Sequence, residues 1–214
     1  MLPFPRRGLY AITRTEKRSK EQILSAVAAT IKGGAVVIQY RDKRNAVSDD
    51  LPRQLLVLCR EQRIPLIIND DIQLAKRIGA DGVHLGREDG RLAQARAALP
   101  ESAIIGISCY NSLHRALQAE CAGATYVAFG RFFASTTKPL AQPAELATLH
   151  KARQRLTVPV VAIGGILPEN GGSLLQAGAD LLAVIGGVFD DEPERAAREY
   201  RQLFDNCPEN AGNG

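Results

Sequence analysis

The chain alternates between short apolar runs and longer stretches in which apolar residues recur every three or four positions. The runs are rich in β-branched residues and apolar at nearly every position, as is typical of parallel strands buried on both faces. The eight runs lie at residues 8–12, 35–39, 65–68, 82–85, 103–107, 125–129, 158–163 and 181–185. Stretches with helical spacing lie at 20–32, 48–62, 71–78, 90–98, 112–122, 143–155, 168–177 and 192–204. Eight strands alternating with eight helices predict an α/β protein with a single (β/α)8 TIM barrel.

A weak repeat supports this fold. Residues 32–35, 78–81, 122–125 and 177–180 each place glycine between a helical stretch and the next strand, where a left-handed residue ends a helix. The alternative is an open doubly wound sheet, but no G-x-G-x-x-G motif follows an early strand. We expect the barrel to span residues 1–205 and the tail, 206–214, to be disordered.

Composition is that of a globular protein, with 45% hydrophobic and 23% charged residues among 214. No apolar run reaches the roughly 18 residues of a membrane span, and no signal-peptide pattern opens the chain, so we expect a cytoplasmic protein without a membrane partner. The four cysteines form no C-x-x-C pair, which favours reduced thiols packed as small hydrophobic groups.

The net charge of +4 is mild. Without tryptophan and without basic residues interleaved with aromatic ones, the sequence argues against a nucleic-acid partner. Small anionic substrates fit the charge equally well. The sequence leaves open whether the chains associate as homo-oligomers.

Candidate chemistry lies where the predicted strands end, because a barrel of this kind carries its site there. After the second strand, alternation along an extended segment places Gln39, Arg41 and Lys43 on one face. These residues are either an ordinary solvated charged run or two cations and an amide that converge on the barrel mouth.

Carboxylates follow the third and fourth strands. Asn69, Asp70 and Asp71 come directly after one strand and Asp89 after the next. Either Asp70 or Asp71 could cap the following helix, which leaves the other free. Two carboxylates on neighbouring loops suit Mg²⁺ held jointly by protein and substrate phosphates. His84 has no Cys or His partner at metal spacing, which favours a structural role over zinc binding.

The later loops offer groups for an anion. The loop after the sixth strand contains Ser135, Thr137 and Lys138, and strands seven and eight both end in Ile-Gly-Gly. Each Gly-Gly pair is either a tight turn or a place where backbone N–H groups approach a phosphate, the usual ligand at this position of the barrel. Together the two ends of the mouth suit the joining of a phosphorylated molecule to a diphosphorylated one.

At these residues the sequence resembles the thiamine phosphate synthase family over essentially the whole barrel. The motifs that carry the resemblance are Gln39-x-Arg41-x-Lys43, Ile68-Asn69-Asp70, residues 82–89, Gly106-x-Ser108, Ser135-x-Thr137-Lys138 and residues 162–166. The resemblance implies a Mg²⁺-dependent condensation in which a pyrimidine diphosphate loses diphosphate and a thiazole phosphate captures the resulting cation.

The resemblance also implies a role for each matching residue. It places the pyrimidine diphosphate on Gln39, Arg41, Lys43, Asn69, Ser108 and Lys138, and Mg²⁺ on Asp70 and Asp89. It places the thiazole phosphate on Ser135, Thr137, Gly165, Ile185 and Gly186. Arg41, Lys43 and Lys138 would act on the departing diphosphate and are the expected catalytic residues.

The sequence departs from the family pattern at several positions. Arg14 stands where the family often has an acid, Arg87 where glutamine is usual, and Gly186 where many members have serine. Residues 109–111 replace a more usual Thr-His pair. Two other functions remain open: a thiazole tautomerase on the same barrel, which has no diphosphate to expel, and a non-catalytic sensor of a phosphorylated ligand, which needs no metal site.

Overall fold

The computed structural model of this protein describes residues 1–43, 48–86, 90–134, 143–190 and 192–207. These residues form a closed barrel of parallel strands in the order β1 to β8, with β1 also paired to β8. The predicted TIM barrel is confirmed. The strands are β1 (Gly8–Ile12), β2 (Ala35–Tyr40), β3 (Leu66–Asn69), β4 (Gly82–Leu85), β5 (Ile104–Tyr110), β6 (Tyr126–Gly130), β7 (Val160–Ile163) and β8 (Leu181–Val184).

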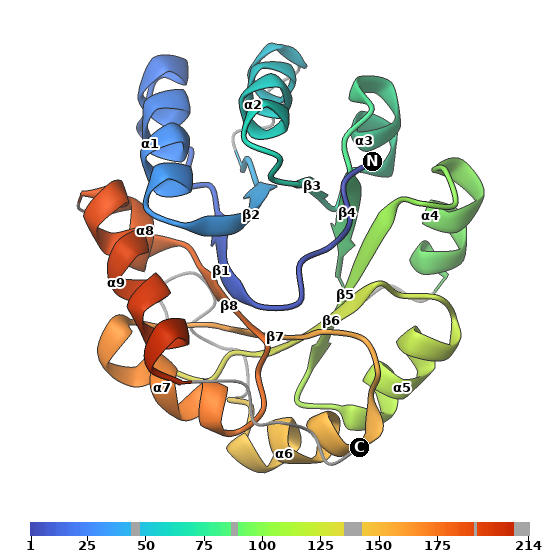
Figure 1. Cartoon of the computed structure of the whole chain (residues 1–214). Helices are drawn as coiled ribbons and strands as arrows, with labels where there is room; N and C mark the ends of the chain where they lie inside the picture. The colour runs from blue at the N-terminus through green and yellow to red at the C-terminus, as the bar shows by residue number, and fades with distance from the viewer. Residues whose placement is uncertain (44–47, 87–89, 135–142, 191, 208–214) are drawn as a thin grey trace.

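Helices surround the strands in chain order (Figure 1). They are α1 (Lys20–Lys32), α2 (Asp50–Glu61), α3 (Ile72–Ile78), α4 (Arg91–Ala98), α5 (Leu113–Cys121), α6 (Leu146–Arg155), α7 (Pro168–Gln176), α8 (Gly186–Phe189) and α9 (Pro193–Asn206). Eight match the predicted helical stretches. The sequence does not predict the short α8, because four residues are too few to show a helical period. The last helix ends at Asn206, one residue into the predicted tail, and residues 208–214 lie outside the described part.

The glycine repeat acts as predicted. Gly34, Gly79, Gly123 and Gly178 have φ values of 112°, 70°, 89° and 110°, a left-handed region that glycine enters without a Cβ clash. Gly79, for example, is the C-cap of α3, and its N–H bonds to carbonyl groups of the last helical turn. Each glycine thus lets the chain leave a helix and turn into the next strand.

Two apolar layers result from the alternation of side chains along the strands. Outward residues pack against the helices in the larger core, and inward residues such as Val37, Ile67 and Val161 fill the barrel. Phe4, from the segment before β1, joins the inner layer and stacks on Tyr126 with ring centroids 4.2 Å apart. Apolar side chains therefore fill the barrel interior, and the polar residues lie at the carboxyl ends of the strands.

All four cysteines are free thiols. Cys59 and Cys109 are buried, and burial raises the pKa of each thiol to about 12. Cys121 is exposed and Cys207 is half-buried. The two buried thiols serve as small hydrophobic groups, as predicted.

Candidate active site

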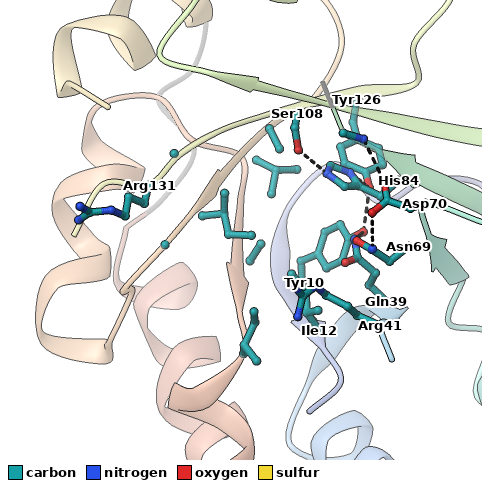
Figure 2. Close-up of a pocket in the computed structure, with 18 of the residues that line it drawn as sticks. Tyr10, Ile12, Gln39, Arg41, Asn69, Asp70, His84, Ser108, Tyr126 and Arg131 are labelled. Atoms are coloured by element: carbon teal, nitrogen blue, oxygen red, sulfur yellow. Dashed lines mark hydrogen bonds between the residues drawn. The ribbon is translucent and has the colours of Figure 1, made fainter. Parts of the chain in front are cut away.

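A cavity of about 250 Å³ lies at the carboxyl ends of the barrel strands (Figure 2). This is the end at which TIM barrels carry their active sites. Six of the predicted site residues line it, namely Gln39, Arg41, Asn69, Asp70, Ser108 and Ile185. Other lining residues were not anticipated, including Tyr10, Ile12, Tyr110, Tyr126 and Arg131. Six predicted site residues, which lie on or directly after the four strands β2, β3, β5 and β8, therefore meet in one cavity.

The end of β2 directs an amide and a cation into the cavity. Gln39 is buried within the strand, and Arg41 follows it directly beyond the strand end. The Arg41 N–H donates to the hydroxyl of Thr13 at 2.9 Å, and that hydroxyl donates to the Arg41 carbonyl at 3.2 Å. This pair of bonds fixes the backbone from which Arg41 extends. Lys43 is exposed and is not among the residues that line the cavity.

The two carboxylates after β3 have different tasks. Asp71 caps α3 by accepting the N–H of Leu74 at 2.8 Å. Asp70 instead lines the cavity, with a φ of 61° that turns the chain away from the strand. Its two oxygens accept bonds from the Asn69 side chain at 2.8 Å and from the Gly86 N–H at 3.2 Å. The structure thus resolves the alternative that the sequence left open: Asp71 is the cap.

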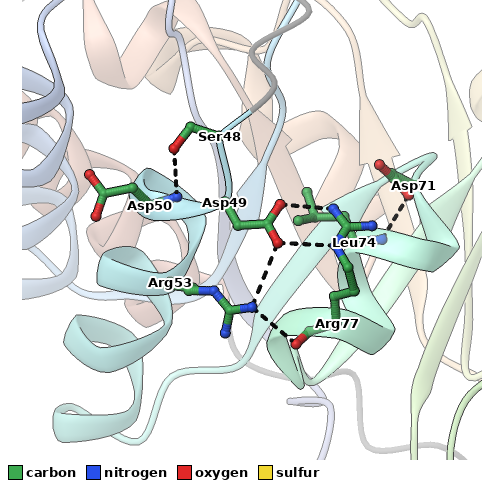
Figure 3. A network of polar contacts seen from close by, with 7 residues as sticks. All are labelled: Ser48, Asp49, Asp50, Arg53, Asp71, Leu74 and Arg77. Atoms are coloured by element: carbon green, nitrogen blue, oxygen red, sulfur yellow. Dashed lines mark hydrogen bonds and ion pairs between the residues drawn. The ribbon is translucent and has the colours of Figure 1, made fainter.

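An ion-pair network joins the helices that follow β2 and β3 (Figure 3). Asp49, just before α2, accepts two bonds from Arg77 of α3, at 3.0 and 2.8 Å, and lies 3.6 Å from Arg53. The hydrogen bond from Arg77 lowers the pKa of the Asp49 carboxyl. The network is largely exposed to solvent, so its contribution to stability is small. It links α2 and α3, the helices that follow the segments carrying Arg41 and Asp70 along the chain.

Five side chains form a continuous hydrogen-bonded chain across the base of the cavity, which we call the floor chain (Figure 2). Gln39 Nε2 donates to the Tyr10 hydroxyl at 2.8 Å, which lies 2.7 Å from the Tyr126 hydroxyl. The Tyr126 hydroxyl lies 2.9 Å from His84 Nδ1, and His84 Nε2 lies 2.9 Å from Ser108 Oγ. His84 is thus satisfied through both ring nitrogens, in line with the structural role favoured by the sequence.

Tight packing holds the tyrosines of the floor chain. A Cβ at Gly106 would lie 2.0 Å from Tyr126 Cζ, so the ring requires glycine at this position. Phe4 stacks on the same ring. Burial raises the pKa values of Tyr10 and Tyr126. Neither tyrosine was predicted as a site residue, although strand alternation alone places Tyr10 on the same inward face as Ile12.

The glycines after β7 make room for the preceding loop. Gly164 and Gly165 have φ values of 106° and 64°. A Cβ at Gly164 would lie 2.3 Å from Arg131 Cβ, and one at Gly165 would lie 2.3 Å from the Ala134 carbonyl oxygen. Gly164 also lines the cavity. The sequence anticipated close approach of a ligand here, and the structure shows close approach of the loop after β6.

The glycine after β8 lies beside an ion pair. Gly186 begins α8, and a Cβ there would lie 2.7 Å from Asp190 Oδ2 and 3.7 Å from Arg14 Nη1. Arg14 and Asp190 are bonded to each other. A Cβ at Gly187 would lie 2.2 Å from the Tyr200 hydroxyl, so a side chain at this position would collide with Tyr200. Two departures from the family pattern, Arg14 and Gly186, are therefore neighbours.

Four predicted site residues, Asp89, Ser135, Thr137 and Lys138, lie outside the described residues. Within the described part of the chain, no group of three or more His, Cys, Asp or Glu side chains could hold a metal ion. The predicted Asp70–Asp89 metal pair therefore stays a prediction. Among the described helices, none combines the length and the apolar character needed to cross a membrane.

The fold and the cavity define a (β/α)8 barrel with a polar ligand site at the carboxyl ends of its strands. Residues 9–188 match the family model described as thiamine monophosphate synthase. The chain is 52% identical to the thiamine-phosphate synthase of Methylococcus capsulatus, with 95% of this chain and 92% of the relative covered. It is 51% identical to the thiamine-phosphate synthase of Nitrosococcus oceani, with 92% and 93% covered.

A solved structure shows a similarity to the same family. Thiamine phosphate pyrophosphorylase from Pyrococcus furiosus superimposes with a TM-score of 0.84 at 33% identity, over 94% of this chain and 97% of that one. The chain therefore belongs to the thiamine monophosphate synthase family.

Proposed function

We propose that this protein is a thiamine-phosphate synthase, a transferase that joins two small phosphorylated molecules. Its substrates are 4-amino-2-methyl-5-(diphosphooxymethyl)pyrimidine and 4-methyl-5-(2-phosphoethyl)thiazole, and its products are thiamine phosphate and diphosphate. The match of residues 9–188 to the family, with near full-length similarity to thiamine-phosphate synthases, carries the proposal. The cavity that gathers Gln39, Arg41, Asn69, Asp70 and Ser108 supports it.

In the proposed reaction, the bond between the pyrimidine methylene carbon and the diphosphate oxygen breaks first. Diphosphate leaves with the bonding electron pair, and the ring nitrogen of the thiazole donates its lone pair to the resulting carbocation. Negative charge grows on the departing oxygen, so a cation placed there stabilises the transition state more than the ground state. We assign this role to Arg41, Lys43 and Lys138, with Asn69 helping to bind the diphosphate.

Mg²⁺ is the proposed cofactor, held by Asp70 and Asp89. Asp70 fits this role because its carboxylate lines the cavity, is 52% exposed and offers oxygen ligands, which Mg²⁺ prefers. Mg²⁺ usually takes only one or two carboxylates and completes its coordination with water and substrate phosphates. When bound, it would neutralise part of the diphosphate charge. Arg91, 3.6 Å from Asp70, adds a protein cation beside the same carboxylate.

The thiazole phosphate is assigned to the opposite side of the mouth. Barrels of this type often hold phosphate on the loops after strands seven and eight and on a short extra helix, and α8 is such a helix. The proposed contacts are Ser135, Thr137, Gly165, Ile185 and Gly186. Ile185 lines the cavity, and Gly165 lies next to the lining residue Gly164. A cytoplasmic location and the absence of nucleic-acid and membrane partners belong to the same proposal.

The test is mass spectrometry of the product formed from the two substrates with the protein and Mg²⁺. We expect thiamine phosphate only when both substrates and the metal are present, and its loss on adding EDTA. The control is incubation of the protein with a tautomer of the thiazole phosphate but without the pyrimidine diphosphate, followed by NMR because the two isomers have the same mass. A tautomerase would convert that isomer, whereas a synthase should not. An electron-withdrawing group on the pyrimidine should slow the reaction sharply, because it destabilises the carbocation.

A further inference from the structure

The floor chain has a direction, because each of its hydroxyl groups has one proton to donate. The Gln39 amide nitrogen is only a donor, so the Tyr10 oxygen accepts from it. Tyr10 must then place its own proton toward Tyr126, its other partner in the chain. Tyr126 accepts that proton and must donate its own to Nδ1 of His84. The direction set at Gln39 thus passes through both tyrosines to the histidine.

The same logic determines what the far end offers to the cavity. His84 accepts at Nδ1, so the neutral ring carries its proton on Nε2 and donates it to Ser108 Oγ. Ser108 accepts this bond, which leaves its own proton available for a ligand. At the near end, Gln39 uses its amide nitrogen on Tyr10, which leaves its carbonyl oxygen as an acceptor. Both terminal residues line the cavity.

Burial keeps this direction fixed. Tyr10, Tyr126 and Gln39 are 1%, 0% and 3% exposed, so solvent water cannot replace one of the internal bonds. Burial also raises the pKa values of both tyrosines, so their hydroxyls keep their protons at neutral pH. Reversing one bond would leave a buried group with a repelling or missing partner, which is costly.

We propose that the floor chain makes the site selective for a 4-aminopyrimidine over its 4-oxo analogue, by fixing Ser108 as a hydrogen-bond donor and Gln39 as an acceptor. This inference rests on the proposed function. An aminopyrimidine offers ring nitrogens that accept and an amino group that donates, which is complementary to that pattern. The 4-oxo form offers a carbonyl oxygen and a ring N–H in their place. Tyr10, Tyr126 and His84 are positioning residues that act through Ser108 and Gln39.

The histidine tautomer tests the direction without any substrate. In the protein labelled with ¹⁵N-histidine, the His84 signals are assigned by their loss in a His84→Asn variant, since only His114 and His150 remain. We expect Nε2 to carry the proton and Nδ1 to have the shift of an unprotonated ring nitrogen. A proton on Nδ1, or on both nitrogens at neutral pH, would overturn the proposal.

Selectivity tests the consequence. We expect the wild-type enzyme to favour the amino substrate over its oxo analogue by at least about 10²-fold in kcat/KM, because the oxo form mismatches buried polar groups. Tyr126→Phe keeps the ring and removes the hydroxyl that joins the two ends of the chain. It should reduce that selectivity by about tenfold, the equivalent of one hydrogen bond, and allow His84 to populate both tautomers.

Tyr200→Phe is the matched control, because Tyr200 is equally buried and donates to the Ile166 carbonyl away from the floor chain. It should leave the selectivity unchanged. Equal loss of activity toward both substrates in Tyr126→Phe, with selectivity intact, would mean that the chain is only structural. If the wild type makes no thiamine phosphate, the proposed function fails, whereas the tautomer measurement still reports on the direction of the chain.

Discussion

The two sides of the barrel mouth present their polar groups in different ways. On the side formed by β2 to β5, the cavity is lined by polar side chains, among them Arg41, Asp70 and Ser108. On the side formed by β7 and β8, the strands end in glycines, and the space a side chain would need is filled by neighbouring loops or by the Arg14–Asp190 pair. The first side therefore depends on chemical groups and the second on close packing.

This difference has a consequence for how each side responds to substitution. A substitution on the side formed by β2 to β5 removes a charge or a hydrogen bond without disturbing the backbone, so it should alter the chemical step. A change at the glycines after β7 and β8 would push neighbouring segments apart, so it should alter binding of the thiazole phosphate proposed to lie there. The following experiments test that division.

The largest effect is expected at Asp70. Asp70→Asn should lower kcat by at least about 10³-fold, because it removes the charge proposed to hold Mg²⁺ beside the departing diphosphate. Asp71→Asn is the control, since Asp71 only caps α3 and asparagine caps nearly as well. Steady-state kinetics across Mg²⁺ concentrations, with circular dichroism to check the fold, make the measurement. Equal losses in the two variants would contradict the assignment.

Lys138 should come next. Lys138→Ala should lower kcat by about 10²–10³-fold with a smaller effect on pyrimidine diphosphate binding, as expected when a preorganised group acts mainly in the transition state. Lys43→Ala should behave alike. Lys151→Ala, on the outer helix α6, serves as a control for loss of one positive charge. A rise in KM with kcat intact would show that Lys138 only holds the bound substrate.

Gly165 tests the glycine side. Gly165→Ala should raise the KM for the thiazole phosphate by about tenfold, because the new Cβ meets the Ala134 carbonyl oxygen and the φ of 64° disfavours alanine. The KM for the pyrimidine diphosphate should stay unchanged. Gly172→Ala is the matched control, since nothing lies within 4 Å of a Cβ at that position. If both KM values rose equally, the two sides would not be separable.

The smallest effect is expected on stability, at Asp49 in the ion-pair network between α2 and α3. Asp49→Asn should lower the Tm by about 1–2 °C at pH 7, because an exposed ion pair contributes little. Arg77 lowers the folded-state pKa of Asp49. The ion pair therefore stabilises the fold fully above the unfolded-state pKa of the Asp49 carboxyl, about 4. It is lost as the pH falls through the lower folded-state value. Thermal melts of both proteins should therefore converge in acid and in high salt.

The sequence predicted the fold well because strand and helix periodicity are local properties. Each predicted strand and helix is present within a few residues, and the glycines that end helices have the expected left-handed backbone. The helix α8 was missed because its four residues are too short to show a period. In the fold, Gly187 packs against Tyr200 and Phe189 is buried, and such contacts between segments cannot be read from the local sequence.

The candidate site was only partly predictable. The positions after the strands could be read from the order of elements, and Gln39, Asn69 and Ser108 do line one cavity. The floor chain could not, since its central bond joins Tyr10 to Tyr126, 116 positions apart. Nor could the local sequence distinguish Asp70 from Asp71, because both can cap a helix and only the turn at Asp70 decides between them.

The contact between Gly106 and Tyr126 has a consequence for how such a barrel can evolve. Any side chain at position 106 would occupy the space of the phenol ring. The two positions therefore cannot drift independently: a lineage that gains a side chain at 106 must first reduce the residue at 126, and with it lose the hydroxyl that joins Tyr10 to His84. Homologous chains should therefore change positions 106 and 126 together. We expect that paired change to accompany a loss of the preference for the 4-aminopyrimidine over its 4-oxo analogue.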